Sequence, residues 1–140
     1  MKTGFWIPVF AVALAIFIGL CWLDMRPGPT LHRAAASGNL KLIKRQLSTG
    51  ADINALDQEG FTPLMRAVQA GHPGTINLLL SSGADINRAG QKGNTALHLA
   101  VLEKNTRSVA RLITAGADLQ LKNADKATPL CLAVQAQPVC

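Results

Sequence analysis

The sequence predicts an all-α solenoid in which short helix pairs stack side by side along one axis. The first observation is a leucine that recurs every 33 residues, at Leu31, Leu64, Leu97 and Leu130. The second is a Gly-Ala-Asp phrase with the same period, which begins at residues 50, 83 and 116. A fixed period in this range is typical of stacked repeats, none of which can bury its apolar face alone. Stacks of this kind mostly present binding surfaces.

An apolar run near the amino terminus lies outside this period. Phe5–Leu23 holds 19 residues without a charge, and as an α-helix it would be about 28 Å long, close to the ~30 Å hydrocarbon core of a bilayer. A cleaved signal peptide is the alternative, but its apolar stretch is normally ~7–15 residues and a small-residue cleavage site should follow. We therefore expect residues 1–26 to form a transmembrane-type helix, with residues 5–23 in lipid, and the protein to be a single-pass membrane protein.

The side of the membrane that the repeats face depends on which charges are counted. Lys2 precedes the apolar run and Asp24 and Arg26 follow it, which slightly favours an exported repeat domain. Counting the basic residues of the first repeat reverses this preference. The cysteines do not decide whether the repeats lie in an oxidising or a reducing compartment. Cys131 and Cys140 would be about 13 Å apart along a helix and could form a disulfide only through a non-helical chain end.

The second repeat illustrates the predicted first helix of each unit. Thr62 is a natural N-cap, and Pro63 then occupies the first helical position, where its fixed φ suits the helix. Leu64, Ala67 and Val68 have the i, i+3, i+4 spacing of one apolar helix face. The pattern predicts a short helix that is buried on one side.

A second helix follows after a break at Gly71. Pro73 begins it, Ile76 and Leu79 belong to its apolar stripe, and Gly83 ends it in the manner of a left-handed cap. Each unit is thus a turn followed by two short antiparallel helices. About three such units are the minimum for a stable stack.

At these residues the sequence resembles the ankyrin repeat family. TPLMRAVQAGH, TALHLAVLEKN and the Gly-Ala-Asp phrases carry the resemblance, which covers about residues 29–136. It implies a repeat domain over residues 27–140. We expect units at about residues 28–60, 61–93 and 94–126 and a truncated one at 127–140. Two lysines depart from the pattern, because Lys104 and Lys126 stand where other units have glycine.

No residue pattern predicts catalysis or a cofactor. The resemblance implies that His32 and His98 form structural hydrogen bonds between adjacent loops, and the repeated aspartates share one environment, unlike a pair of catalytic acids. The net charge of +6 is spread over all the repeats, and Phe61 is the sole Phe, Trp or Tyr beyond residue 23. Nucleic-acid binding would need clustered charge and stacking aromatics, so we expect neither a nucleic acid nor a small-molecule substrate.

The remaining expectation is a protein partner. The resemblance implies that partners meet the turn tips and the exposed face of the first helices. These positions are occupied by Gln58, Glu59, Phe61, Gln69, Gln91, Lys92, Asn94 and Glu103. Phe61 is the large aromatic among them, a residue type that is often a binding hot spot when exposed. The alternative for Phe61 is that its ring folds back over the first unit. We expect a membrane-tethered interaction module; the alternative is an exported soluble protein that protects, inhibits or stabilises a partner enzyme after signal cleavage.

Overall fold

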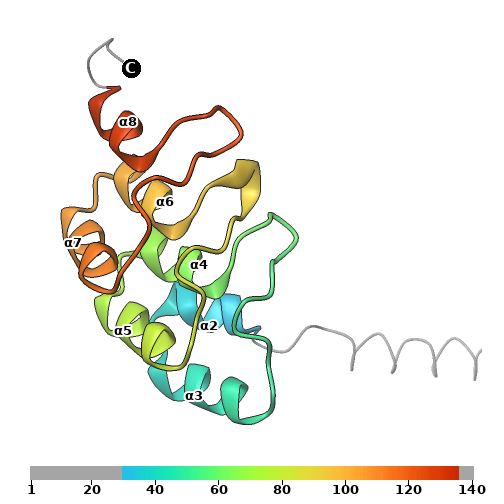
Figure 1. Ribbon diagram of the computed structural model, residues 1–140. Helices are drawn as coiled ribbons and strands as arrows, with labels where there is room; N and C mark the ends of the chain where they lie inside the picture. The colour runs from blue at the N-terminus through green and yellow to red at the C-terminus, as the bar shows by residue number, and fades with distance from the viewer. Residues whose placement is uncertain (1–29, 136–140) are drawn as a thin grey trace, which may run out of the picture.

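Three helix pairs and a single last helix stack along one axis in the computed structural model, which describes residues 30–135 (Figure 1). The elements, in chain order, are α2 (Leu31–Ser37), α3 (Leu40–Ser48), α4 (Pro63–Ala70), α5 (Pro73–Ser81), the 3-10 turn η1 (Gln91–Gly93), α6 (Ala96–Leu102), α7 (Thr106–Thr114) and α8 (Pro129–Val134). Every regular element among the described residues is helical, so the predicted all-α repeat stack is confirmed for this part of the chain.

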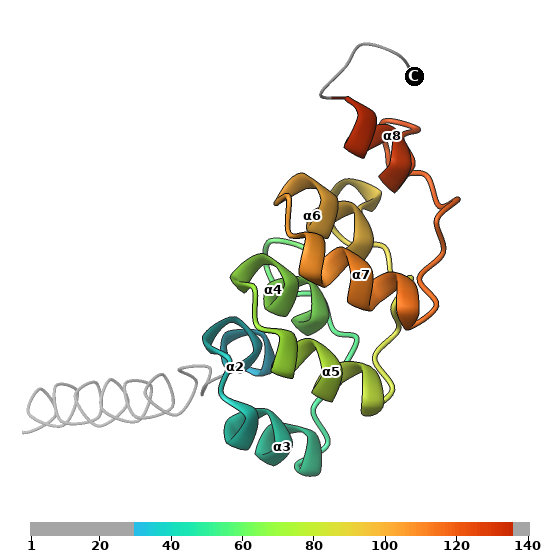
Figure 2. The ribbon, with the colours of Figure 1, turned by 90° about the vertical axis from the view of Figure 1, so that its left-hand side faces the viewer.

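The helices form two rows. The first helices α2, α4, α6 and α8 pack closely on one another in sequence, whereas the second helices α3, α5 and α7 lie beside them in a row with sparser contacts between neighbours (Figure 2). The loops that join successive pairs project together from one side of the stack (Figure 1). The molecule therefore presents a side formed by loops and another formed by the second helices.

Side-chain caps fix where the helices begin. The hydroxyls of Thr62, Thr95 and Thr128 each accept a hydrogen bond from a backbone N–H in the first turn of α4, α6 and α8. Asn39 and Asn105 cap the second helices α3 and α7 in the same way. Each cap satisfies a donor that the helix leaves without a partner, so the predicted N-cap of the repeat phrase is confirmed.

The periodic leucine is buried in three of its four positions. Leu31, Leu64 and Leu97 are 4%, 1% and 1% exposed and lie in one continuous apolar core. Leu130, in the same position of α8, is 71% exposed. The last repeat thus keeps the sequence of a buried face, but α8 is the last helix that the structure describes, and no unit within residues 30–135 packs on its far side.

Lysines occupy left-handed backbone positions that glycines hold elsewhere in the stack. Gly71 has φ of 71° and Lys104, 33 residues later, has φ of 53°. Gly93 and Lys126 form a second such pair, with φ of 70° and 59°. The repeat therefore imposes its turn geometry even where the residue has a Cβ, at some cost in backbone strain.

The predicted single-pass membrane location, with its lean towards export, is wrong on this structure. Within residues 30–135, no helix has both the length and the apolar character needed to cross a bilayer. The segment on which the prediction rested, residues 5–23, lies outside the described residues, as do the rest of the predicted anchor at 1–26 and Cys140.

Candidate functional site

Backbone hydrogen bonds join the tips of neighbouring loops. The N–H of Gln91 donates to the carbonyl of Gly60 at 2.7 Å, and the N–H of Ala124 donates to the carbonyl of Lys92 at 2.9 Å. These bonds link three successive loops along the stack (Figure 1). The tips therefore form one continuous row, which we call the loop row, at residues 57–61, 90–94 and 123–127.

Asp57 shapes the first loop of this row. One of its carboxylate oxygens, Oδ1, accepts hydrogen bonds from the backbone N–H groups of Glu59 and Phe61, both at 3.0 Å. The N–H of Gly60 donates to the carbonyl of Asp57 and closes the turn, in which Gly60 adopts a φ of 77°. An acidic side chain that bonds to nearby backbone in this way is a local substitute for regular structure.

Arg66, on α4, ties the same loop to the helix. Its Nε donates to Asp57 Oδ2 at 2.7 Å, and its Nη2 lies 2.8 Å from Glu59 Oε2. The guanidinium carbon also lies 4.6 Å from the centroid of the Phe61 ring, within reach of a cation–π interaction. A single arginine thus holds both acids and the aromatic ring of the loop.

The network shifts the titration of its two central groups. Burial opposes the charged form of Asp57, but hydrogen bonds from the backbone of Phe61 and from Arg66, with the charge of Arg66, outweigh it and lower the pKa of the carboxyl. Burial likewise opposes the charge of Arg66, while Asp57 and Glu59 raise the pKa of the guanidinium. Both groups are therefore ionised at neutral pH, and the network is intact there.

Seven of the eight predicted partner-binding residues are at least partly accessible. Gln58, Glu59, Gln91, Lys92 and Glu103 are exposed. Gln69 and Asn94 are half-buried: the amide oxygen of Gln69 lies 3.4 Å from Arg66, and that of Asn94 accepts a hydrogen bond from Asn123 at 2.9 Å. The loop row brings together Gln58, Glu59, Gln91, Lys92 and Asn94, whereas Gln69 lies on α4 and Glu103 at the end of α6.

Phe61 does not fit the expectation of an exposed aromatic. Its side chain is 8% exposed and belongs to the apolar core. The ring packs inward from the loop, and Arg66 lies over its face. Phe61 therefore anchors the loop, and the prediction that it offers an exposed hot spot is wrong.

The sequence interpretation missed Arg66 and Asp57, which organise the loop. Their opposite charges were visible in the sequence, but the eight residues between them include a turn whose path the sequence does not specify. The ion pair is evident only once the loop is seen to fold back along α4.

His32 and His98 form structural hydrogen bonds, as the resemblance implied. The buried His98 accepts a hydrogen bond from the N–H of Thr95 at Nδ1, so its Nε2–H donates to the carbonyl of Ala127 at 3.1 Å. Nε2 of His32 lies 2.8 Å from the carbonyl of Ala55. Each ring thus joins a first helix to the following loop. Across residues 30–135, no three His, Cys, Asp or Glu side chains form a group that could hold a metal ion.

Comparison with known proteins agrees with this architecture. The family described as Ankyrin repeats (3 copies) matches residues 31–123, about two thirds of the chain. The chain belongs to the ankyrin repeat family. Ankyrin repeat proteins are generally non-catalytic modules for protein–protein interaction, and the helix pairs and joined loops described above are those of such a module.

The similarity to one curated protein is confined to about the length of one repeat unit. The chain is 42% identical over 38 residues to a protein of Gibberella zeae named Transcription regulator FGM4. The match covers 27% of this chain and spans 14% of the length of that protein, little more than one 33-residue repeat. The likeness is therefore to a repeat unit, and the regulatory role in the printed name is that of the relative.

Proposed function

We propose that this ankyrin module binds a protein partner across the loop row and the adjacent exposed residues of the first helices. Within it, Gln58, Glu59, Gln91 and Lys92 contribute most of the contact, with Asn94 beside them. Gln69 and Glu103 extend the surface onto the helices. The module carries out no chemistry in this proposal; its activity is recognition.

The observation that carries this proposal is the pair of backbone hydrogen bonds between loop tips. Because Gln91 N–H is bound to Gly60 and Ala124 N–H to Lys92, the exposed side chains of neighbouring loops keep a fixed spacing. The Asp57–Arg66–Glu59 network fixes the first loop further. A surface that is already ordered loses less conformational entropy when a partner binds, which favours affinity.

The test is quantitative affinity capture with the full 140-residue chain as bait. Replacing three exposed loop residues, through Gln58→Ala, Gln91→Ala and Lys92→Glu, should reduce recovery of the specific partner by about tenfold or more, as removal of interface contacts commonly does. A matched control carries Lys41→Glu, Ser48→Ala and Ser82→Ala, which make the same kinds of change on the exposed side of the second helices. Recovered proteins are quantified by mass spectrometry.

Both variants should unfold at the same temperature as the unmodified chain, since all six positions are exposed. Loss of a partner with the loop variant but not with the control supports the loop row as the binding surface. Equal recovery of every specific protein by the unmodified chain and the loop variant would contradict it.

A further inference from the structure

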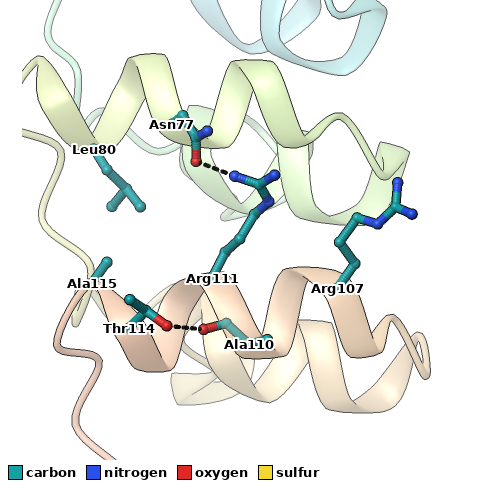
Figure 3. Close-up of a pocket in the computed structure, with 7 residues that line it drawn as sticks. All are labelled: Asn77, Leu80, Arg107, Ala110, Arg111, Thr114 and Ala115. Carbon is teal, nitrogen blue, oxygen red and sulfur yellow. Dashed lines mark hydrogen bonds between the residues drawn. The ribbon is translucent and has the colours of Figure 1, made fainter.

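A groove of about 530 Å³ runs between the second helices α5 and α7 (Figure 3). These two helices belong to the row of second helices, which lies away from the loop row (Figures 1 and 2). Its lining residues are Asn77, Leu80, Arg107, Ala110, Arg111, Thr114 and Ala115. We call it the α5–α7 groove. The sparse contact between these two helices is what leaves it open.

Two arginines of α7 extend across this groove towards α5 (Figure 3). Arg107 and Arg111 are four residues apart, so they lie on the same face of the helix, one turn from each other. Nη1 of Arg111 donates to Oδ1 of Asn77 at 2.8 Å, which orients its guanidinium group. Its Nε is shielded from solvent and has no acceptor among the described residues. Arg107 is exposed. Because Nε is shielded, Arg111 can offer an incoming acceptor only the N–H groups of its terminal nitrogens, whereas Arg107 offers an exposed guanidinium group.

The rest of the lining is largely apolar. Leu80, Ala110 and Ala115 contribute carbon surface from the two helices. The hydroxyl of Thr114 donates to the carbonyl of Ala110 at 2.8 Å, so the polar atom of Thr114 is already satisfied within its own helix. The groove thus combines an apolar floor with two positive charges along one edge.

The arginine pair is absent from the neighbouring second helix. The residues 33 positions earlier, on α5, are Gly74 and Leu78, whereas those 66 positions earlier, on α3, are the basic residues Lys41 and Arg45. The α5 unit folds without a charge at either position, so the repeat architecture does not require one there. Surface positions whose residue differs between units are where a repeat protein can distinguish one unit from the next.

The surrounding helix row has one sign of charge. The described second helices carry five basic residues and no Asp or Glu: Lys41, Lys44, Arg45, Arg107 and Arg111. The acidic residues of the described chain lie in loops and turns. An anionic partner would therefore be attracted to this side, and the arginine pair would direct it to the groove.

We propose that the α5–α7 groove binds an acidic helical segment of a partner protein. Two carboxylates one turn apart on that segment meet Arg107 and Arg111, whose planar guanidinium groups suit paired hydrogen bonds to carboxylate oxygens. An apolar side chain between them packs on Leu80 and Ala110. A nucleic acid fits less well, because the groove has no aromatic side chain on which bases could stack.

The test uses a fluorescein-labelled helical peptide with two glutamates one turn apart and a leucine between them. Fluorescence anisotropy measures its affinity for the full 140-residue chain and for the R107Q/R111L variant. Leucine at residue 111 reproduces Leu78 of the preceding repeat, so the fold should be retained, as a thermal melt would verify. We expect the dissociation constant to rise by about tenfold or more, the size expected for loss of charge-assisted hydrogen bonds.

Three controls separate this site from general attraction. The K41Q/K44Q variant also removes two positive charges, but from α3, and should change the affinity by less than about threefold, as expected for screened surface charges. The same peptide with glutamines in place of both glutamates should bind as weakly to the unmodified chain as to R107Q/R111L. Single-stranded oligodeoxythymidylate should not displace the peptide. Three outcomes would each overturn the proposal. The peptide could bind R107Q/R111L as tightly as the unmodified chain, K41Q/K44Q could lose as much affinity as R107Q/R111L, or the oligonucleotide could displace the peptide. These outcomes are independent of the loop row, none of whose residues is changed.

Discussion

Leu97 and Leu130 occupy the same position in successive repeats, yet their surroundings differ almost completely. Leu97 lies on α6, which packs between α4 and α8, and is 1% exposed, whereas Leu130 on α8 is 71% exposed. Each is the second residue of a short helix that a threonine caps at its N-terminus. The difference therefore arises from the neighbours of the helix and not from its own sequence.

This contrast shows where the stability of the stack resides. In a repeat protein the apolar surface of each unit is buried by the units on either side. A helix inside the stack is therefore covered on two faces, and a helix at the end of the stack on one. The exposed apolar surface continues beyond Leu130: Val134 on α8 is 39% exposed, and Ile113 on the last second helix is 46% exposed. The carboxyl-terminal end of the described stack is thus expected to tolerate changes that the interior cannot.

Truncation of the two leucines should give the largest contrast. Leu97→Ala removes a fully buried side chain and should lower the free energy of unfolding by about 3 kcal/mol, within the usual cost of a core cavity. Leu130→Ala should cost less than about 0.5 kcal/mol, as a surface change does. Urea unfolding followed by far-ultraviolet circular dichroism measures both. Equal losses would show that α8 is covered in solution by something that buries Leu130.

The periodic core was largely predictable from the sequence, because a residue buried by repetition leaves a repeating signal. The caps at Thr62, Thr95 and Thr128 and the helix pairs followed from the spacing alone. The exposure of Leu130 did not, since the period reports which face would be buried if a neighbour were present. Whether a neighbour is present is a property of the stack.

The candidate site was less predictable, because it is built from residues that do not repeat. The accessibility of the loop residues Gln58, Gln91 and Lys92 follows from their turn positions. The inward packing of Phe61 depends on the cover supplied by Arg66, nearby in sequence but placed by the path of the loop. The arginines of the α5–α7 groove carried one usable signal, the contrast with Gly74 and Leu78 at the same positions of α5, but the groove itself depends on helix spacing.

The loops at the two ends of the loop row allow a second, smaller comparison. Asp57 and Asn123 lie 66 residues apart, two periods, and accept equivalent backbone hydrogen bonds: Asn123 Oδ1 accepts from the N–H groups of Asp125 and Ala127, both at 3.0 Å. Asp57→Asn should therefore keep the turn, as Asn123 does, and lose the charge facing Arg66. We expect the free energy of unfolding at pH 7 to fall by about 1.5 kcal/mol, the low end of the ~1.5–3 kcal/mol typical of a hydrogen bond to a charged group, because both side chains are partly exposed.

The pH dependence isolates the charge from the turn. The folded-state pKa of Asp57 is lowered from its ordinary value of 3.8, so its stabilisation is present above that value and is lost as the pH falls through the folded pKa. The difference in unfolding free energy between the unmodified chain and Asp57→Asn should thus be constant near neutral pH and shrink below about pH 3.8. A difference that does not change with pH would mean that the ion pair with Arg66 contributes nothing. Asn123→Asp is the reciprocal control, and it should gain no comparable stabilisation because no arginine bonds to residue 123 in the described structure.

The smallest expected effect concerns the left-handed lysine of the last loop. Lys126 has φ of 59° where the equivalent Gly93 has φ of 70°, so Lys126→Gly relieves the crowding of a Cβ in this conformation. Glycine also gains more freedom in the unfolded chain, which offsets part of the relief. The net change should be a stabilisation of about 0.5 kcal/mol, measured by the same urea unfolding. Lys122→Gly, at an exposed neighbour that is not among the positive-φ residues, should instead destabilise by about 0.5–1 kcal/mol, since it increases only the freedom of the unfolded chain. If both substitutions lowered the stability equally, residue 126 would not hold the left-handed conformation that Gly93 adopts in the preceding loop. The last repeat would then differ from the interior repeats in its turn geometry as well as in the exposure of Leu130.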